Sequence, residues 1–585
     1  MDQDRLKSLA RESHHNIIIS WDNFDYSQTV RHQTLRDPSK HVCATTGKLC
    51  LGQCIPDGGL LRSMFHPEVP LDPDDVHLAP GNRMDDISKA CQRFWIAEAI
   101  SYIHQHAVKS IFETDKSRTS TAGLSSLTYP EFPSVERLAT RRTPHFGLGP
   151  ILENEGTIEG TYEVIDKIFQ RQLNLNEVVD FKRRLLPAYG DQKTVSLIQS
   201  VKRERQYCEN TYGRYQWLLP IPGLFHYRTN FMDMVYDVYG GSKIDHASSE
   251  PTTLLHNQLY MGCVQGHKSP FHHKEEVATR AFDARISAKF YERIRDQVNI
   301  KDRDAINQYI KSLDRQTFLT HVEEIRKSTF TREAQEPVES APEGPSTVNY
   351  QLLAHNRFLC QMETYKSLKY AIKYADIGLI KRIFARCCLL FEGSNKTKYA
   401  YLSLYMTWLT HTEAAAPELQ KAILANGLVN LRGKEDSWFE MDRLNEFFNL
   451  QMKNIMATRR SSTQDVIDLF RRVAMTASYS SELKSALEFS FGGRSSGRHQ
   501  VKDASEDVYR LAYHLCASKS VYDYPGGRES GFNPPDIISH IANQLATKIE
   551  RFNASQFGDD DVDDADTVPI VALDDILDED SDIDD

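Results

Sequence analysis

Long apolar runs and the common nucleotide-binding and metalloprotease motifs are missing from this 585-residue sequence. No stretch of about eighteen or more apolar residues occurs, so we expect no membrane-spanning helix. Residues 1–15 contain no apolar core of the kind that a secretory signal needs, so we expect an intracellular protein. GxxxxGK[ST] and HExxH are also absent, which argues against a phosphate-loop nucleotidase and a zincin-type protease.

Cysteine is scarce and has no regular spacing. The ten cysteines form no disulfide framework, which is typical of proteins in a reducing compartment. The nearest approach to a metal cluster is His41 with Cys43, Cys50 and Cys54. This group lacks the CxxC spacing that structural zinc sites commonly use, so a zinc protein remains only an alternative.

Negative charge is concentrated at one end of the chain. Fourteen of the 81 acidic residues and none of the 70 basic ones lie in residues 559–585, so the rest of the chain carries a formal charge of +3. The composition of this tail predicts disorder. A nearly neutral body with local basic runs is compatible with binding to nucleic acid.

The segment Asn16–Tyr26 (NIIISWDNFDY) is typical of a buried strand over 16–21 that ends at a carboxylate. A carboxylate beside a buried strand is costly unless it is paired, hydrogen-bonded or bound to a cation. Asp22 is therefore a candidate metal ligand, with Asp25 as a substitute. The alternative is that Asp22 merely begins a turn. Residues 41–52 that follow predict a hairpin with its turn at Thr46-Gly47-Lys48.

Two further buried strands have the same pattern of strand, polar residue and helix. The first ends at Gly190-Asp191, and residues 194–205 predict the helix that follows it. Asp191 is a second candidate ligand, or alternatively an N-cap of that helix. The next strand, 216–222, leads to His226, which could contact a phosphate or a metal or be structural. Lys193 and His226 are candidate nucleic-acid contacts.

A helix after Asp436-Ser437 brings a third carboxylate. Met441, Leu444, Phe448, Met452 and Ile455 form its apolar stripe, and Asp442, Glu446, Asn449 and Lys453 form a polar stripe. Such a polar stripe is either the solvent-exposed face of a helix or a set of ligands. Glu446, with Asp442 or Glu440 as the other possibilities, is the candidate. Arg494 and Arg498 lie in a later Gly/Ser-rich segment that could contact phosphates.

The order of these elements predicts a mixed α+β protein with a ribonuclease-H-like sheet interrupted by a large helical insertion. Two strand-end aspartates and one helical glutamate could hold Mg²⁺ or Mn²⁺, which prefer hard oxygen ligands. We divide the chain into the following parts: 1–240, first part of the core; 241–330, mixed and helical insertion; 331–349, linker; 350–435, helical insertion; 436–556, helical return to the core; 557–585, acidic tail.

Several motifs add a family resemblance that extends over most of residues 16–540. They are Trp21-Asp22-Asn23-Phe24, Thr45-Thr46-Gly47, Gly190-Asp191-Gln192-Lys193-Thr194, Leu219 to His226 (LPIPGLFH), and Asp442-Arg443-Leu444-Asn445-Glu446. In this order they resemble a fungal family known as domain of unknown function 6589. Its members resemble mobile-element proteins whose transposases carry an Asp-Asp-Glu triad on a ribonuclease-H-like core. The resemblance implies Asp22, Asp191 and Glu446 as metal ligands, and DNA as the substrate.

Two functions follow as expectations. The first is metal-dependent cleavage or strand transfer on DNA in the nucleus. The second is a catalytically inactive nuclear protein whose helical half and acidic tail bind basic nuclear proteins.

Overall fold

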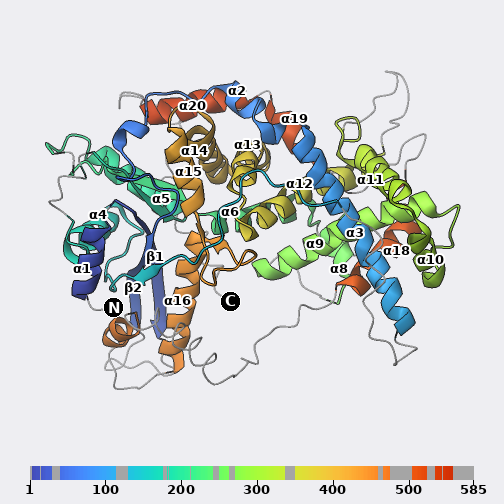
Figure 1. Ribbon diagram of the computed structural model, residues 1–585, viewed down its shortest axis with the longest axis horizontal. Coiled ribbons are helices and arrows are strands. Elements are labelled where there is room, and N and C mark those ends of the chain that lie inside the picture. The colour runs from blue at the N-terminus through green and yellow to red at the C-terminus, as the bar shows by residue number, and fades with distance from the viewer. Residues whose placement is uncertain are drawn as a thin grey trace.

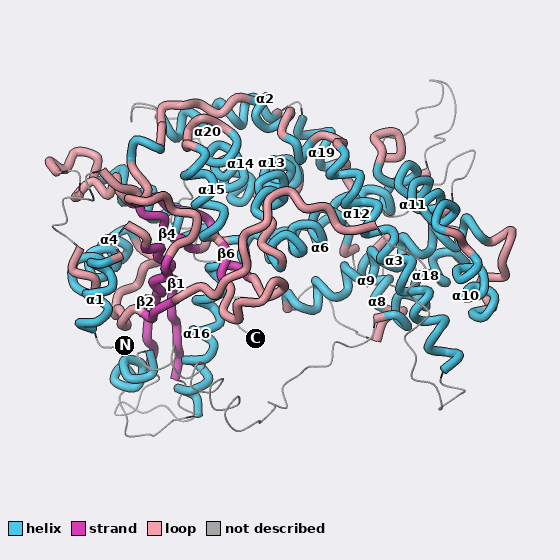
Figure 2. The backbone as a smooth tube through the Cα atoms, in the orientation of Figure 1, coloured by secondary structure: helices cyan, strands magenta, loops and turns pink. Residues whose placement is uncertain are grey.

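The computed structural model combines a small mixed sheet with many helices (Figures 1 and 2). In Figure 1 the sheet lies at the left, and helices α9, α11 and α12 extend to the right. The structure describes residues 3–13, 15–28, 40–112, 130–175, 181, 183–210, 212–241, 250–262, 270–335, 349–458, 466–474, 504–522, 532, 534–542 and 544–557. Arg494, Arg498, most of the expected linker and the acidic tail lie outside these residues. No helix among them is long and apolar enough to cross a membrane.

The sheet has five strands in the order β3-β2-β1-β4-β5. Their bounds are β1 Ile17–Gln28, β2 Lys40–Leu51, β3 His145–Gly147, β4 Leu186–Gly190 and β5 Leu218–Pro222. β1 pairs antiparallel with β2 and parallel with β4, and β5 is parallel to β4. The carboxyl ends of β4 and β5 therefore lie at the same edge of the sheet.

Two sequence expectations about the first strands were wrong. β1 continues to Gln28, because Phe24 is also buried and extends the alternation of buried side chains, so Asp22 lies inside the strand. Residues 40–51 form one strand rather than a hairpin, and Gly47 pairs with Trp21 in its middle. A Cβ atom at Gly47 would lie 2.8 Å from Leu148, so the glycine permits a close approach instead of making a turn.

Helices cover both faces of the sheet. In chain order, the helices up to residue 330 are α1 Gln3–Glu12, α2 Pro73–His77, α3 Asp86–Phe112, α4 Ile158–Asp166, α5 Gln192–Glu204, α6 Leu224–Tyr239, α8 Leu254–Gln258, α9 Phe271–Ile294, α10 Arg303–Ser312 and α11 Arg315–Phe330. The helices after residue 349 are α12 Tyr350–Lys373, α13 Ile377–Gly393, α14 Thr397–His411, α15 Pro417–Asn426, α16 Met441–Thr458, α18 Ser505–Ala517, α19 Ile537–Ala542 and α20 Leu545–Phe557. Ile17, Ile19 and Trp21 pack against residues of α4, and the alternate side chains of β1 face α16.

Helix α16 begins later than the sequence predicts. Asp436-Ser437 does not cap it, because Phe439–Glu440 first form the short strand β7, which pairs with β6 at Leu428–Val429. Asp442 and Asn449 on its polar stripe are each only 4% exposed, so this stripe is not a solvent-exposed face. Its apolar stripe is buried as expected, since Met441, Leu444, Phe448 and Met452 all lie in the core.

A buried ionic network joins α6, α9, α12 and β7. Arg228 of α6 pairs with Glu440 of β7 and, at 2.5 Å, with Glu275 of α9. Glu275 also accepts hydrogen bonds from the Tyr365 hydroxyl and from Lys369, both on α12. Glu440 is fully buried, so this network fixes the start of α16 relative to the helical insertion.

Acid is expected to weaken this network. Burial alone would raise the pKa of Glu275, but the charges of Arg228 and Lys369 lower it to about 2. Because the folded-state pKa lies below the unfolded value of about 4.5, the stabilisation is complete above pH 4.5 and disappears as the pH falls toward 2. The effect has an upper limit of about 3 kcal/mol. Urea unfolding between pH 6 and pH 3 measures it, and Glu275→Gln should flatten the profile. An equally steep profile in that variant would contradict the assignment.

Candidate functional site

Asp22 lies on the face of β1 that α16 covers. The Asn445 side chain donates a hydrogen bond to Ser20 Oγ at 2.6 Å, and Asn449 Nδ2 donates one to Asp22 Oδ2 at 3.0 Å. Asn449 also donates to the Asn23 carbonyl and accepts a bond from Thr46 Oγ1 at 2.6 Å. Asn449 is thus held by both β1 and β2, and it orients the Asp22 carboxylate.

Asp191 directly follows β4, the parallel neighbour of β1. Its Oδ1 accepts the backbone N–H of Thr194 at 2.6 Å, so Asp191 is the N-cap of α5. The cap and a site role are compatible, because one carboxylate oxygen is sufficient for the cap. The parallel pairing of β1 with β4 puts the two aspartates on neighbouring strands, and the charge of Asp191 contributes to the raised pKa of Asp22.

Glu446 completes the set that the sequence predicts. The pKa of Asp22 is raised well above its usual value, first by burial and then by the charges of Glu446, Glu155 and Asp191. The pKa of Glu446 is also raised, by burial and by its acidic neighbours. The elements that carry these residues, separated by more than four hundred positions in the sequence, lie beside one another, since β1 pairs with β4 and contacts α16 (Figure 2).

Glu155 is a fourth carboxylate, which the sequence analysis missed. Its side chain is buried, and it accepts a hydrogen bond from Thr194 Oγ1 at 3.3 Å. Burial and then the charge of Asp191 raise the pKa of Glu155. The residue precedes α4 in a loop that has no periodic pattern. The only local signal is Thr157, which caps α4 two residues later.

His226 is the cationic partner of this cluster. It is the third residue of α6, and its Nδ1 lies 3.1 Å from Asp442 Oδ2 while its Nε2 lies 3.6 Å from Glu446 Oε1. Burial would lower the pKa of His226, but the hydrogen bond and charge of Asp442, with the charges of Asp191 and Glu446, raise it to about 10. His226 is therefore an imidazolium at neutral pH.

Asp442 has a positioning role in this arrangement. Its carboxylate accepts the backbone N–H groups of Phe225 and His226, at 3.0 and 3.2 Å, and so caps α6. A Cβ atom at Gly223 would lie 2.2 Å from the same carboxylate, which explains the glycine of the PGLFH motif. Because Asp442 is occupied here and Glu440 pairs with Arg228, Glu446 is the α16 carboxylate best placed to bind a cation.

Other residues from the sequence analysis lie elsewhere. Asp25 points to the opposite face of β1 from Asp22, because the two are three positions apart in a strand. Asp25 lies 3.7 Å from His41 and beside Cys43, and all three are exposed at one end of the β1–β2 pair. Cys50 is buried with its thiol toward Met441. Lys193 lies in the first turn of α5 and its charge acts on Glu155.

The donor set suits a hard divalent cation. Across the described ranges, no ion pair joins Lys or Arg to Asp22, Asp191 or Glu155. Burial, and then the charges of neighbouring carboxylates, raise the pKa of Asp22 and of Glu155. Carboxylate oxygens are the ligands that Mg²⁺ and Mn²⁺ prefer. In the same ranges, only Asp25, His41 and Cys43 bring three ligand atoms within 4.8 Å of one another. The acidic cluster is therefore wider than the closed ligand set of a single ion.

Comparison with known proteins gives a family but no function. The model of the family described as "Family of unknown function (DUF6589)" matches residues 92–500. The match covers more than half of the chain, so the chain belongs to this family. No curated protein matches the sequence. No solved structure matches the fold.

Proposed function

We propose that this member of the DUF6589 family is a nuclear, metal-dependent enzyme that cleaves or transfers DNA strands. In this proposal Asp22, Asp191 and Glu446 hold Mg²⁺ or Mn²⁺, and Glu155 assists them. The observation that carries the proposal is that Asn449 bonds Asp22 and so holds α16, which carries Glu446, against β1, while Thr194 contacts both Asp191 and Glu155 at the end of the neighbouring strand β4. Four carboxylates beside one cationic histidine destabilise one another unless cations neutralise them.

The sheet supports the same proposal. On one side of the sheet β3, β2 and β1 are antiparallel neighbours, and on the other side β4 and β5 run parallel to β1 and are joined through helices. Carboxylates lie on β1 and at the end of its neighbour β4, and a helix from far along the chain adds another. This is the arrangement expected of a ribonuclease-H-like core that a helical insertion interrupts. The resemblance to mobile-element transposases rests on the order of the sequence motifs, and this arrangement is compatible with it.

The residues around the carboxylates have separate roles. Asn449 fixes the direction of Asp22, and the N-terminus of α5 fixes Asp191. His226, held by Asp442, neutralises part of the charge on Glu446. Mg²⁺ or Mn²⁺, when bound, would stabilise the attacking and leaving oxygens of an in-line displacement at phosphorus. Two such ions lie about 3.5–4 Å apart, which suits a cluster wider than one closed ligand set.

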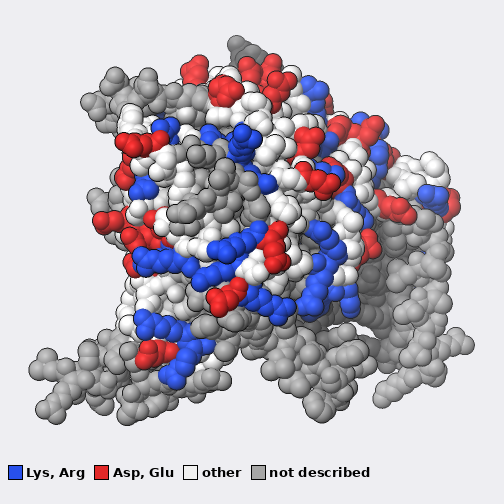
Figure 3. All heavy atoms as spheres, turned by 60° about the vertical axis from the view of Figure 1, so that its left-hand side comes forward, with Lys and Arg blue, Asp and Glu red and all other residues white. Residues whose placement is uncertain are grey.

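Basic side chains near α16 suit a polyanionic substrate. Figure 3 shows a band of Lys and Arg across one face of the molecule. The exposed residues Arg141, Arg142, Arg432 and Lys434 lie on two segments that meet beside α16. The segments are joined by the hydrogen bond from Thr143 N to the Asn430 carbonyl. Such residues bind phosphates without reading sequence.

Metal binding tests the proposal directly. Mn²⁺ should support cleavage of duplex DNA by the full chain, and EDTA should abolish it.

Asn449→Ala, which removes the group that orients Asp22, should weaken Mn²⁺ binding by about 10–100-fold, as loss of other outer-shell partners does. Asn454→Ala is the matched control, because Asn454 lies on the same helix with its side chain exposed. Calorimetry gives both affinities. Equal Mn²⁺ affinities in the two variants, or cleavage that persists in EDTA, would overturn the proposal.

A further inference from the structure

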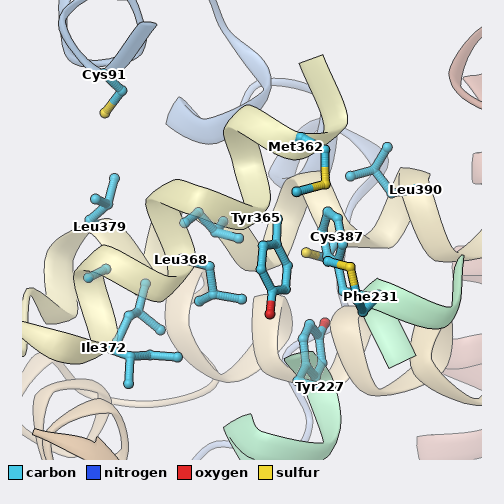
Figure 4. Close-up of a cluster of buried hydrophobic side chains, with 14 of the residues drawn as sticks. Cys91, Tyr227, Phe231, Met362, Tyr365, Leu368, Ile372, Leu379, Cys387 and Leu390 are labelled. Carbon is cyan, nitrogen blue, oxygen red and sulfur yellow. The ribbon is translucent and has the colours of Figure 1, made fainter. Parts of the chain in front are cut away.

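Cys43 differs from most other described cysteines in its surroundings. Six of the described cysteines are buried: Cys50, Cys91, Cys360, Cys387, Cys388 and Cys516. Figure 4 shows one of them, Cys387, among the apolar side chains of α6, α12 and α13. Such cysteines pack as small apolar residues. Cys43 and Cys54 are exposed, and in the described part of the chain only Cys43 belongs to a group of three possible metal ligands.

The pairing of β1 with β2 brings four polar side chains together at the exposed end of the two strands. Asp25 pairs with Cys43, and Ser27 pairs with His41. Residues two apart in a strand share a face, and so do cross-strand partners, so all four side chains lie on one face. The opposite face packs into an apolar core formed with the end of α16. That packing fixes the register of the strands and therefore the positions of the four side chains.

Three of these side chains bring ligand atoms close together. One ligand atom each from Asp25, His41 and Cys43 lies within 4.8 Å of the other two, and His41 Nε2 is 3.7 Å from Asp25 Oδ1. Zinc bonds of about 2.0–2.3 Å in a tetrahedron separate the ligand atoms by about 3.3–3.7 Å. Small side-chain movements are therefore sufficient to enclose an ion. The side chains of His41 and Asp25 are 53% and 54% exposed, so an ion can reach them from solvent.

Ser27 determines which nitrogen of His41 is available to an ion. Ser27 Oγ lies 2.8 Å from His41 Nδ1. When Nδ1–H donates to Ser27 Oγ, Nε2 keeps its lone pair, and Nε2 is the nitrogen near Asp25. A metal-bound histidine almost always donates from its other ring nitrogen in this way. The hydrogen bond to Ser27 is therefore a second observation that points to a metal ligand.

The donor chemistry of this group favours zinc. A thiolate is a soft ligand, and zinc binds sulfur, imidazole nitrogen and carboxylate oxygen together. Burial, and then the hydrogen bond and charge of Asp25, raise the pKa of the Cys43 thiol, so zinc displaces a proton to water when it binds. Mg²⁺ and Mn²⁺ prefer oxygen ligands, as the acidic cluster offers. Asp25 and Asp22 lie on opposite faces of β1, so the two sites are separate.

We propose that Asp25, His41 and Cys43 form a zinc site whose fourth coordination position is filled by water. The ligand set differs from the group that the sequence suggests. Cys50 lies on the other face of β2 with its thiol toward Met441 of α16, and Cys54 follows the far end of β2. Zinc joins the outer ends of β1 and β2, and because it binds the folded strand pair it also raises the unfolding temperature.

The affinity for zinc tests the site. The probe is ZnCl₂, titrated calorimetrically into the full chain, reduced and treated with chelator, in excess Mg²⁺ that occupies the acidic cluster. Zinc should bind, and Cys43→Ser and His41→Gln should each weaken its binding at least tenfold. Cys54→Ser, which removes the other exposed cysteine, should not change the affinity. Asp22→Asn should also leave it unchanged, so a failure of the proposed function is distinguishable from a failure of this inference.

Co²⁺ in place of zinc identifies the thiolate ligand. Sulfur-to-cobalt charge-transfer absorption should appear in the unchanged chain and in Cys54→Ser, and should be absent from Cys43→Ser. Ser27→Ala should weaken zinc binding by about 10–100-fold and keep the absorption band, because Ser27 only orients His41. The side chains are exposed, so the variants should fold, and thermal unfolding without metal checks this; Asp25→Asn replaces any that does not. Absence of zinc binding, equal affinity in all variants, or a band that persists in Cys43→Ser would overturn the inference.

Discussion

Asp22→Asn, Asp191→Asn and Glu446→Gln are each expected to lower Mn²⁺-dependent DNA cleavage by about a thousandfold. Each change removes one charge from the cluster while keeping the shape of the side chain. A lost ligand removes several kcal/mol of transition-state stabilisation, and each 1.36 kcal/mol corresponds to a factor of ten in rate. Cleavage of a labelled duplex under single-turnover conditions measures the effect.

Asp25→Asn is the matched control for this prediction. Asp25 lies on the same strand as Asp22 but on the opposite face, where it is exposed beside His41. The control should cleave at the wild-type rate. Unfolding temperatures should not fall in the Asp22 and Asp191 variants, since removing charge from a repulsive cluster does not weaken the fold. Equal cleavage by all variants would remove Asp22, Asp191 and Glu446 from the reaction, and absence of cleavage by the unchanged chain would favour instead a catalytically inactive nuclear protein that binds partners.

The three residues that we propose as ligands stand out in the sequence because each directly follows or belongs to a strongly patterned element. The apolar run before Asp22, the buried strand before Asp191 and the amphipathic helix around Glu446 are all visible in the sequence. The parallel pairing of β1 and β4 then brings the first two together. The hydrophobic pattern and the order of the strands are sufficient to single out residues of this kind.

The sequence alone could not predict the roles of Glu155, His226 and Asp442. Glu155 enters the site from a loop, and its position depends on the bridge between Thr45 and Ile151, which no local pattern encodes. The roles of His226 and Asp442 depend on the approach of α6 to α16, which requires the absence of a side chain at Gly223. The sequence left Asp25 as a substitute ligand, because a strand that ended at residue 21 would not fix the direction of its side chain. Since β1 continues to Gln28, the alternation of side chains places Asp25 on the opposite face of the strand from Asp22. Tertiary packing, rather than propensity, determines all of these.

Arg228→Met is expected to lower the free energy of unfolding by about 3–5 kcal/mol, the range for breaking a buried ion pair from one side. The change leaves Glu440, which is fully buried, and Glu275, which is 14% exposed, without their shared cation. Urea unfolding at pH 7 measures the loss. Lys274→Met is the control, because Lys274 pairs with the more exposed Asp233 and should cost less than about 1 kcal/mol.

A second substitution, at Glu440, separates the effect of the unpaired buried charge on stability from the effect of lost packing. Glu440→Gln in the Arg228→Met background should recover part of the lost stability, because it removes the buried charge that has no cation.

Arg228 lies two residues after His226 on α6, and Glu440 lies two residues before Asp442, which is at the start of α16. The same ion pair therefore joins the two segments that hold the cationic end of the acidic cluster. If the pair fixes that geometry, Arg228→Met should also weaken Mn²⁺ binding at temperatures where the variant is fully folded. Unchanged Mn²⁺ affinity there would limit Arg228 to a role in stability.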